Sequence, residues 1–284
     1  MTQSHPLNSA LVLVAGATGG VGQLAVGQLV MQGIPVRALT RNPEKAEQLF
    51  AGPTSDQQAT PLQITQGDIL NPATLPAAVE GVTHIICCTG TTAFPSQRWQ
   101  FPEPKAPGNP LDWLEIYGSP QNYGEIARNS PQKVDAEGVE NLVQAAPKDL
   151  QQFVLISSCG ILRRQQLPFS ILNAFGVLDA KLQGETTLIQ SGLPYTIIRP
   201  GRLIDGPYTS YDLNTLIKAK TKGQYDVVLG QGDTLSGEAS RIDVARAAVE
   251  CLNAPITVGK TFDLINEGAR PTAIDWSRLF STLA

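Results

Sequence analysis

Three glycines at regular spacing follow a short apolar run near the start of the chain. Gly16, Gly19 and Gly22 form a G-x-x-G-x-x-G pattern directly after the apolar residues 11–15, and a helical apolar period follows. Glycine permits a tight turn, and it leaves room where a bound group must approach the backbone. The N-terminus of a helix adds N–H groups and a partial positive charge that suit phosphate. The pattern therefore predicts a site for the pyrophosphate of a dinucleotide.

Each glycine has its own task in this interpretation. Gly16 allows the turn, Gly19 lets a backbone N–H approach the pyrophosphate, and Gly22 lets the helix pack closely against the strand. A glycine-rich turn without a ligand is the alternative, but the position at the first strand-to-helix turn favours the dinucleotide. The remaining residues of this loop that are expected at the site are Thr18, Gly20 and Val21.

The end of the second predicted strand indicates which dinucleotide binds. An Asp or Glu at this place accepts hydrogen bonds from the ribose hydroxyls of NAD. Here the strand, residues 35–40, ends without a carboxylate and is followed by Arg41. A guanidinium suits the 2′-phosphate of NADP(H), which it can hold by paired charge-assisted bonds. The sequence therefore predicts NADP(H), and a solvated charge at the strand end is the alternative role for Arg41.

Two further strand ends supply candidate cofactor contacts. Asp68 and Ile69 follow the third predicted strand, where the adenine would lie. Asp68 would either accept from the adenine amino group or cap the helix that follows, and the sequence leaves both roles open. Thr89 and Gly90 follow the fourth strand and form a small turn that would let the cofactor pass closely.

The elements that must position these residues alternate regularly along the chain. The expected strands are apolar on both faces, as strands of a parallel sheet with helices on both sides are. Alternation of strands and helices predicts an α/β fold with a doubly wound parallel sheet. The expected strands are residues 11–15, 35–40, 62–66, 83–88, 152–157, 194–199 and 260–265. The expected helices are residues 21–32, 43–50, 73–80, 134–146, 174–191 and 242–252.

Composition limits the function classes. The 284 residues contain no internal repeat or linker, so we expect a single domain over residues 1–284. The net charge of -4, without a basic block, argues against nucleic acid or an acidic membrane surface as the main partner. The apolar runs are too short for a transmembrane segment, and the N-terminus lacks a secretory signal. We therefore expect a cytoplasmic protein, or one of the plastid stroma if a transit peptide was removed.

Cysteine and histidine exclude other chemistry. None of the four cysteines belongs to a C-x-x-C pair, and all lie in apolar stretches, so we expect buried reduced thiols. With only His5 and His84, the sequence offers no zinc-ligand spacing and no plausible Ser-His-Asp triad. No metal site is predicted. The cysteines are Cys87, Cys88, Cys159 and Cys251.

One stretch, residues 91–131, interrupts the alternation. It is rich in Pro, Gly and Asn and also contains several large aromatic residues. A loop of this length is usually functional or disordered, and the aromatic residues favour packing of at least part of it. Two roles stay open, namely cover for apolar surface and a lid over a ligand. The aromatic residues are Phe94, Trp99, Phe101, Trp113, Tyr117 and Tyr123.

Several segments together resemble the atypical short-chain dehydrogenase/reductase group. The resemblance is to its NAD(P)H-binding branch, which contains NmrA-like and flavin/biliverdin-reductase-like proteins and many cyanobacterial and plastid members. PYTIIRPG followed by SRIDVA is fairly specific to this branch. The resemblance implies a Rossmann fold of about seven strands, with a substrate side built from residues 91–131 and 202–240. The segments are the glycine motif and residues 40–46, 67–69, 134–146, 154–158, 194–201 and 240–245.

The resemblance also implies an active site at the end of the fifth strand. It points to Ser157 and Ser158 there, although an alignment shift of one residue would put Cys159 at the catalytic serine position. Lys181 matches the lysine that holds the nicotinamide ribose. The tyrosine that typical members carry four residues earlier, as general acid, is replaced here by Val177.

Two residues at the end of the sixth predicted strand, Arg199 and the following Pro200, belong to the same expectation. Pro200 would lie beside the cofactor. Arg199 would either leave the strand beside the nicotinamide amide or form a buried ion pair, and both roles stay open. Lys181 likewise has an alternative role as a solvent-facing helix lysine.

Two function classes follow from these residues. The first is an NADPH-dependent reductase of a small conjugated acceptor (a quinone, flavin, enone or tetrapyrrole), because such acceptors can take their proton from water. The second is a non-catalytic NADPH-binding regulatory or assembly protein with a protein partner, which the missing tyrosine favours. An epimerase or dehydratase of nucleotide sugars is the weakest interpretation, because it needs that tyrosine.

Overall fold

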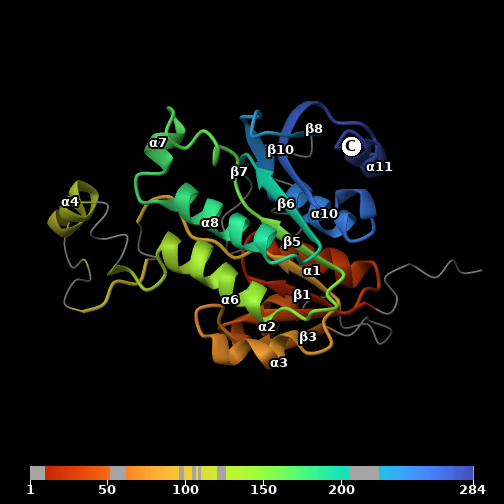
Figure 1. The fold of residues 1–284 in the computed structure, drawn as a ribbon, viewed down its shortest axis with the longest axis horizontal. Coiled ribbons are helices and arrows are strands. Elements are labelled where there is room, and N and C mark those ends of the chain that lie inside the picture. Colours follow the sequence, from red (N-terminus) through yellow and green to blue (C-terminus); the bar gives the residue numbers. More distant parts are fainter. Residues whose placement is uncertain are drawn as a thin grey trace, which may run out of the picture.

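A mostly parallel sheet forms the centre of the computed structural model (Figure 1). The structure describes residues 10–51, 62–95, 99–103, 107, 110–119, 126–204 and 224–283. The eight strands lie in the order β3-β2-β1-β4-β5-β6-β10-β8, and all neighbours are parallel except β8 and β10. The strands are β1 (Val12–Ala15), β2 (Val36–Thr40), β3 (Leu62–Gln66), β4 (His84–Cys87), β5 (Gln152–Ile156), β6 (Tyr195–Pro200), β8 (Tyr225–Gly230) and β10 (Lys260–Ala269).

The strand order confirms the doubly wound α/β class. The chain proceeds from β1 outward to β3, then returns to pair β4 with the other side of β1 and continues through β5 and β6. The reversal between β1 and β4 is the place where folds of this kind bind ligands, outside the carboxyl ends of the strands. The apolar pattern of the sequence did not predict β8. The reason is physical: β8 is an antiparallel edge strand with only one fully buried residue, Val227, so it lacks the continuous apolar run of the parallel strands.

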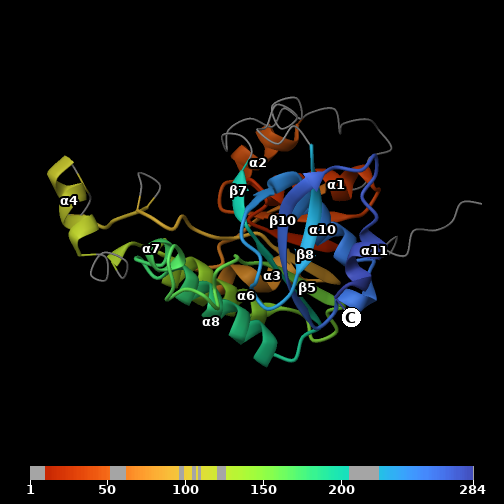
Figure 2. The same cartoon turned by 90° about the horizontal axis from the view of Figure 1, so that it is seen from above.

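Helices cover both faces of the sheet (Figure 2). The expected helices are present with small changes of boundary. Residues 134–146 divide into a π-helical turn, η3, and the α-helix α6. The expected helices correspond to α1 (Gly22–Met31), α2 (Pro43–Phe50), η2 (Pro72–Thr74) with α3 (Leu75–Val79), η3 (Gln132–Glu137) with α6 (Gly138–Ala145), α8 (Val177–Gln190) and α10 (Arg241–Cys251). Short elements that were not expected are α4 (Pro110–Gly118), α7 (Phe169–Leu172), η4 (Pro255–Thr257), α11 (Trp276–Ser281), β7 (Arg202–Ile204) and β9 (Glu238–Ser240).

Strand β1 shows why the strands are apolar on both faces. Val12 and Val14 pack in the layer that includes α1, α10 and α11, whereas Leu13 and Ala15 pack in the layer that includes α3 and α6. All four side chains are fully buried. Two apolar layers therefore fix the sheet between its helices and hold the carboxyl ends of the strands in place.

The turn between β1 and α1 depends on two close approaches. Gly16 has a φ of +74°, and a Cβ there would lie 3.0 Å from the carbonyl of Cys88 and the amide of Thr89. A Cβ on Gly22 would lie 2.2 Å from the carbonyl oxygen of Gly16. Gly16 therefore lets the turn pack against the end of β4, and Gly22 lets α1 pack against the turn.

Substitution at Gly22 tests this packing, and Gly27 in the same helix provides the control. Gly22→Ala should lower the free energy of unfolding by about 1–3 kcal/mol, because the backbone of the turn must move away from the new methyl group. A Cβ on Gly27 meets nothing within 4 Å. Gly27→Ala should therefore raise stability, by up to about 1 kcal/mol, through helix propensity. Urea unfolding of both variants measures the difference, and equal effects would contradict this account of the turn.

Candidate functional site

Two connected cavities lie at the carboxyl ends of the strands. The smaller has a volume of about 240 Å³ and lies between the glycine turn and the ends of β2 and β3. The larger has a volume of about 1390 Å³ and extends from the same turn to the ends of β5 and β6 and to α7 and α8. Both are lined by Thr18, Gly19, Arg41 and residues 88–91. Their lining residues together extend from the end of β3 to the end of β6.

The structure brings nearly all the candidate site residues to these cavities. The smaller cavity is lined by Gly16, Thr18, Gly19, Arg41, Asp68, Ile69, Thr89 and Gly90, among others. The larger is lined by Thr18, Gly19, Gly20, Val21, Arg41, Thr89, Gly90, Ser157, Ser158, Lys181 and Pro200, among others. Gly22 lines neither, which agrees with its close contact beneath the turn.

Arg41 lies between the end of β2 and the start of α2. Asn42 caps that helix, since its Oδ1 accepts from the backbone N–H of Lys45 at 2.9 Å. The cap fixes the direction in which the chain leaves the strand. Arg41 is exposed and lines both cavities, and Lys45 lines the larger one. Two cationic side chains therefore stand at the open side of the site.

Asp68 does not cap the helix that follows, because the N-cap residue of η2 is Asn71 and it makes no side-chain cap bond. Asp68 forms a local turn instead. Its Oδ1 accepts from the backbone N–H of Leu70 at 2.9 Å, and its own N–H donates to the hydroxyl of Thr74 at 3.0 Å. These bonds hold the turn that leads from β3 into η2. The residue also lines the smaller cavity, so this turn forms part of the cavity wall.

Lys181 forms an ion pair that the sequence analysis did not expect. Its Nζ lies 2.6 Å from Oδ1 of Asp135, and the two side chains are only 14% and 1% exposed. The other carboxylate oxygen accepts from the N–H of Thr91 at 3.2 Å. Burial raises the pKa of Asp135, and the ammonium of Lys181 and the N–H of Thr91 oppose that shift. The alternative of a solvent-facing lysine is therefore wrong.

Close packing around the Asp135–Lys181 pair explains why the turn after β4 has a glycine, Gly90, at this position. A Cβ on Gly90 would lie 3.2 Å from Oδ1 of Asp135 and 3.4 Å from Nζ of Lys181. Asp135 itself lies on the π-helical turn η3, a kind of irregularity that is frequent at functional sites. The sequence feature that could have indicated Asp135 as a site residue is its acidic side chain between Val134 and Ala136 on a helix expected to be apolar.

Ser157 and Ser158 differ in what their hydroxyls bind. The hydroxyl of Ser158 donates to the carbonyl oxygen of Cys159 at 3.0 Å. The hydroxyl of Ser157 is buried at the larger cavity and has no hydrogen-bond partner among the described residues. A buried hydroxyl without a partner is costly, so Ser157 is the serine with a free group to offer a ligand.

The thiol of Cys159 is engaged in a structural hydrogen bond and is not a reactive nucleophile. Its Sγ donates to the carbonyl oxygen of Arg199 at 3.0 Å. Burial raises the pKa of this thiol to about 12, and the nearby carboxylates of Asp263 and Asp233 contribute. A thiol with such a pKa stays protonated at neutral pH and is a poor nucleophile.

Arg199 forms the buried ion pair that was one of its two open roles. Its Nε and Nη2 donate to the two carboxylate oxygens of Glu185, at 3.0 and 2.5 Å. The bidentate pair joins β6 to α8 beside the site.

Val177 is the first residue of α8 and is buried at the wall of the larger cavity. It lies on the same helix as Lys181, four residues earlier. The place of the usual tyrosine is therefore aliphatic, and it contributes no proton to the cavity.

The described part of residues 91–131 packs at the start of α8. Rings of Phe94, Trp99 and Tyr117 surround Phe175, with centroid separations of 6.3, 5.9 and 5.8 Å. Near this cluster, residues 91–93, Gln100 and Asn129 line the larger cavity. Tyr123, the side chain of Trp113 and residues 205–223 of the expected substrate side lie outside the described residues.

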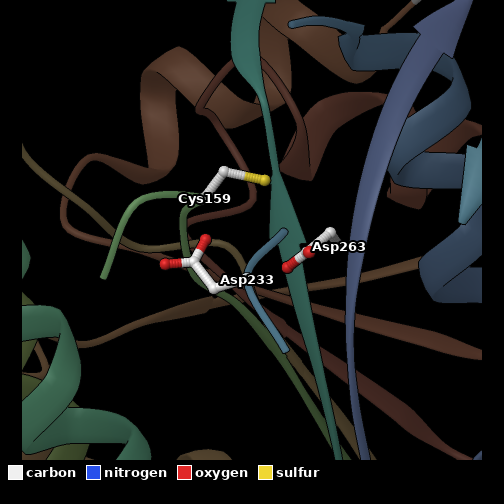
Figure 3. A group of neighbouring side chains, drawn as sticks. All are labelled: Cys159, Asp233 and Asp263. Carbon is white, nitrogen blue, oxygen red and sulfur yellow. The ribbon is translucent and has the colours of Figure 1, made fainter. Parts of the chain in front are cut away.

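Cys159, Asp233 and Asp263 form a buried group, of which Cys159 also lines the larger cavity (Figure 3). Their ligand atoms are within 4.8 Å of one another. Asp233 accepts from the N–H groups of Gly160 and Leu162 through its two oxygens. Oδ2 of Asp263 accepts from the N–H groups of Thr234 and Leu235, whereas its Oδ1 is buried without a hydrogen-bond partner among the described residues. The two aspartates therefore fasten the loop after β5 and the loop after β8.

The fold and the two cavities define a dinucleotide-binding protein of the Rossmann type. A family model described as NAD(P)H-binding matches residues 16–255, and the chain belongs to that family. It therefore binds a nicotinamide dinucleotide. No helix among the described residues is both long and apolar enough to cross a membrane.

Known proteins similar to this chain include plant proteins and a bacterial enzyme. The chain is 31% identical to Protein TIC 62, chloroplastic, of Pisum sativum over 274 residues, which cover 92% of this chain and 44% of that protein. It is 31% identical to sanguinarine reductase of Eschscholzia californica, with 95% and 94% covered. The crystal structure of the oxidoreductase ylbE from Lactococcus lactis shares the fold, with a TM-score of 0.64, 19% identity and 96% of each chain covered. The chain thus spans less than half the length of the TIC 62 protein.

Removal of one partner from the buried ion pair tests its importance for stability. Asp135→Ala should lower the free energy of unfolding by up to about 3 kcal/mol, because the ammonium of Lys181 is left without its counter-charge. The double variant Asp135→Ala/Lys181→Met should lose less. Glu137→Ala, in the exposed pair with Lys133 on the same turn, is the control and should cost less than about 1 kcal/mol. Chemical unfolding measures all three, and equal losses for Asp135→Ala and Glu137→Ala would refute a special role for the buried pair.

Proposed function

We propose that this protein is an NADPH-dependent reductase of a small conjugated acceptor, such as a quinone, flavin, enone or tetrapyrrole. The observation that carries the proposal is the unpartnered hydroxyl of Ser157, which lies in the same cavity as Lys181 while Val177 takes the place of the usual acid. The similarity to sanguinarine reductase over nearly the full length of both chains supports a reductase.

The residues around the cavities fit a nicotinamide dinucleotide. Gly19 and Gly20 bring backbone without side chains to the cavity at the N-terminus of α1, where a pyrophosphate would be held. Arg41 and Lys45 supply positive charge for a 2′-phosphate. The ribose of the nicotinamide would lie at Lys181. This arrangement is our reason for proposing NADPH instead of NADH.

The reaction needs few protein groups. The reduced nicotinamide supplies a hydride when it is bound. Ser157 donates a hydrogen bond to an oxygen of the acceptor and orients it. Lys181, whose charge is compensated by Asp135, would position the ribose through its remaining ammonium N–H groups.

The missing acid determines which acceptors react. Val177 has no proton to give, so a simple ketone or aldehyde lacks the general acid catalysis that is typically worth about 10²–10⁴-fold. A conjugated acceptor spreads the developing charge over its ring system and can take its proton from water. The site therefore favours conjugated acceptors over simple carbonyl compounds.

A second candidate function is a non-catalytic NADPH-binding regulatory or assembly protein. The absence of the tyrosine favours this function. The chain is also similar to Protein TIC 62, chloroplastic, whose name does not describe a reductase. That relative also supports the plastid alternative for location. The free hydroxyl of Ser157 favours the reductase, because a protein that only binds the cofactor has no need of it.

Arg41 provides the test of cofactor choice. Wild-type protein should bind NADPH more tightly than NADH, and Arg41→Ala should weaken NADPH binding about tenfold to a hundredfold, equivalent to about 1.5–3 kcal/mol, without change for NADH. Arg246→Ala is the control, since Arg246 is exposed and lines neither cavity. Calorimetry measures the affinity of each of the three proteins for NADPH and for NADH. Equal affinity of the wild type for NADPH and NADH would rule out this role of Arg41.

A panel of acceptors tests the reductase itself. NADPH oxidation should be measurable with quinones or flavins and about 10²–10⁴-fold slower with simple ketones and aldehydes. Val177→Tyr should improve ketone reduction. Ser157→Ala should lower turnover of the conjugated acceptors about tenfold or more, whereas Ser158→Ala, with its hydroxyl committed to a carbonyl, should change it little.

The outcomes of this panel are distinct. Tight NADPH binding without turnover of any conjugated acceptor would favour the regulatory or assembly protein. Efficient ketone reduction by the wild type would show that another residue supplies the proton.

A further inference from the structure

Four large aliphatic side chains are exposed in the segment that follows the two serines. Leu162 is 52% exposed, Leu167 75%, Ile171 58% and Leu172 39%. We refer to this segment, residues 160–172, as the apolar rim. Single exposed aliphatic residues are normal on a protein surface, but several that gather beside a cavity mark a binding surface.

The apolar rim is continuous with the larger cavity. Pro168, Phe169 and Leu172 line the cavity, and the first two precede or begin α7. Figure 1 shows α7 at the outer end of α8, on the side of the sheet away from β3. Apolar surface therefore leads from the cavity that contains Ser157 and Lys181 to the outside of the protein.

Internal contacts hold the apolar rim in shape. The ring of Phe169 packs directly on Gly160, where a Cβ would lie 2.1 Å from the ring, and the guanidinium of Arg163 lies 4.5 Å from its centroid. Asp233 accepts from the backbone N–H groups of Gly160 and Leu162, at 2.6 and 2.7 Å. The turn at Leu162 and the helix α7 are therefore packed together, which holds the backbone that carries the exposed side chains.

The charges of the apolar rim are already paired. Arg163 lies 3.2 Å from Asp233, and Arg164 lies 2.6 Å from Asp179. An acidic protein or an anionic lipid surface is recognised by unpaired Lys and Arg, which this segment does not provide among its described residues. An uncharged apolar group fits the apolar rim better.

We propose that the apolar rim binds an apolar tail of the substrate, so that the acceptor is amphiphilic: a conjugated ring in the cavity carrying an alkyl or prenyl chain. The inference rests on the proposed function and names its substrate class. The ring lies beside Ser157 and Lys181, and the chain leaves past Phe169 and Leu172 and covers Leu167 and Ile171. Without a chain, the same aliphatic residues stay in water at a free-energy cost that a bound chain removes.

The test compares two quinones that differ only in the tail. One is a methylated benzoquinone, and the other is the same ring with a decyl chain. The wild type should show a KM about tenfold lower for the decyl quinone, with similar kcat. Leu167→Ser/Ile171→Ser should remove this preference and leave the KM of the tailless quinone and the affinity for NADPH unchanged. Ile189→Ser is the matched control, because Ile189 is 44% exposed on α8 but lines neither cavity.

A binding measurement separates failure of this inference from failure of the proposed function. Calorimetry with the corresponding decyl-substituted methoxybenzene, which cannot be reduced, should show binding to the wild type and a loss of about tenfold in the double variant, even if no quinone is turned over. Equal KM values for the two quinones together with equal binding of tailed and tailless analogues would overturn the inference. A second result would also overturn the inference. If no tail preference exists and the double variant abolishes binding to vesicles of neutral lipid, the apolar rim binds a membrane. If it abolishes self-association instead, the apolar rim binds a second copy of the chain.

Discussion

The buried ion pair of Asp135 and Lys181 is the interaction that organises the functional side of this protein. A carboxylate that is almost fully buried needs a counter-charge, and the ammonium at 2.6 Å supplies it. The same carboxylate accepts from Thr91, so three separate pieces of chain, η3, α8 and the turn after β4, meet at one charge. The turn comes this close only because Gly90 has no side chain. The position of the lysine in the cavity is therefore set by the sheet and two helices together.

The ion pair also bears on Val177, which stands where the resembled group has a tyrosine as general acid. In the resembling group, a tyrosine and a lysine act together on one helix face. Here Val177 and Lys181 occupy those two positions. The lysine forms an ion pair with Asp135, and the valine packs in an apolar cluster with Ile161 and Leu178. Under the proposed function, the site would hold the dinucleotide and orient an acceptor, but Val177 would supply no proton. Its chemistry accordingly depends on what the acceptor can do for itself.

The sequence predicted the parts that a regular pattern encodes. The parallel strands, the helices α1, α2, α8 and α10 and the glycine turn follow from apolar periodicity and from a motif at a strand end, and the structure contains them within a few residues. Asp135 was missed because its partner is 46 positions away in the chain, and no local pattern reports such a contact. The difference between Ser157 and Ser158 could not be predicted either, since it depends on which hydroxyl has a carbonyl oxygen within reach. β8 and the short helices α7 and α11 were missed because their stability comes from tertiary packing instead of their own period.

The order of strands at the far edge of the sheet has a consequence for how the chain is made. β8 precedes β10 in the sequence, yet its partner in the sheet is β10, whose other neighbour is β6. During synthesis the strands from β1 to β6 can pair as they emerge, but β8 must wait with open hydrogen-bonding groups until residues 260–269 leave the ribosome. The edge of the sheet is thus completed last, and a nascent chain halted before β10 carries an unprotected strand that invites association with other chains.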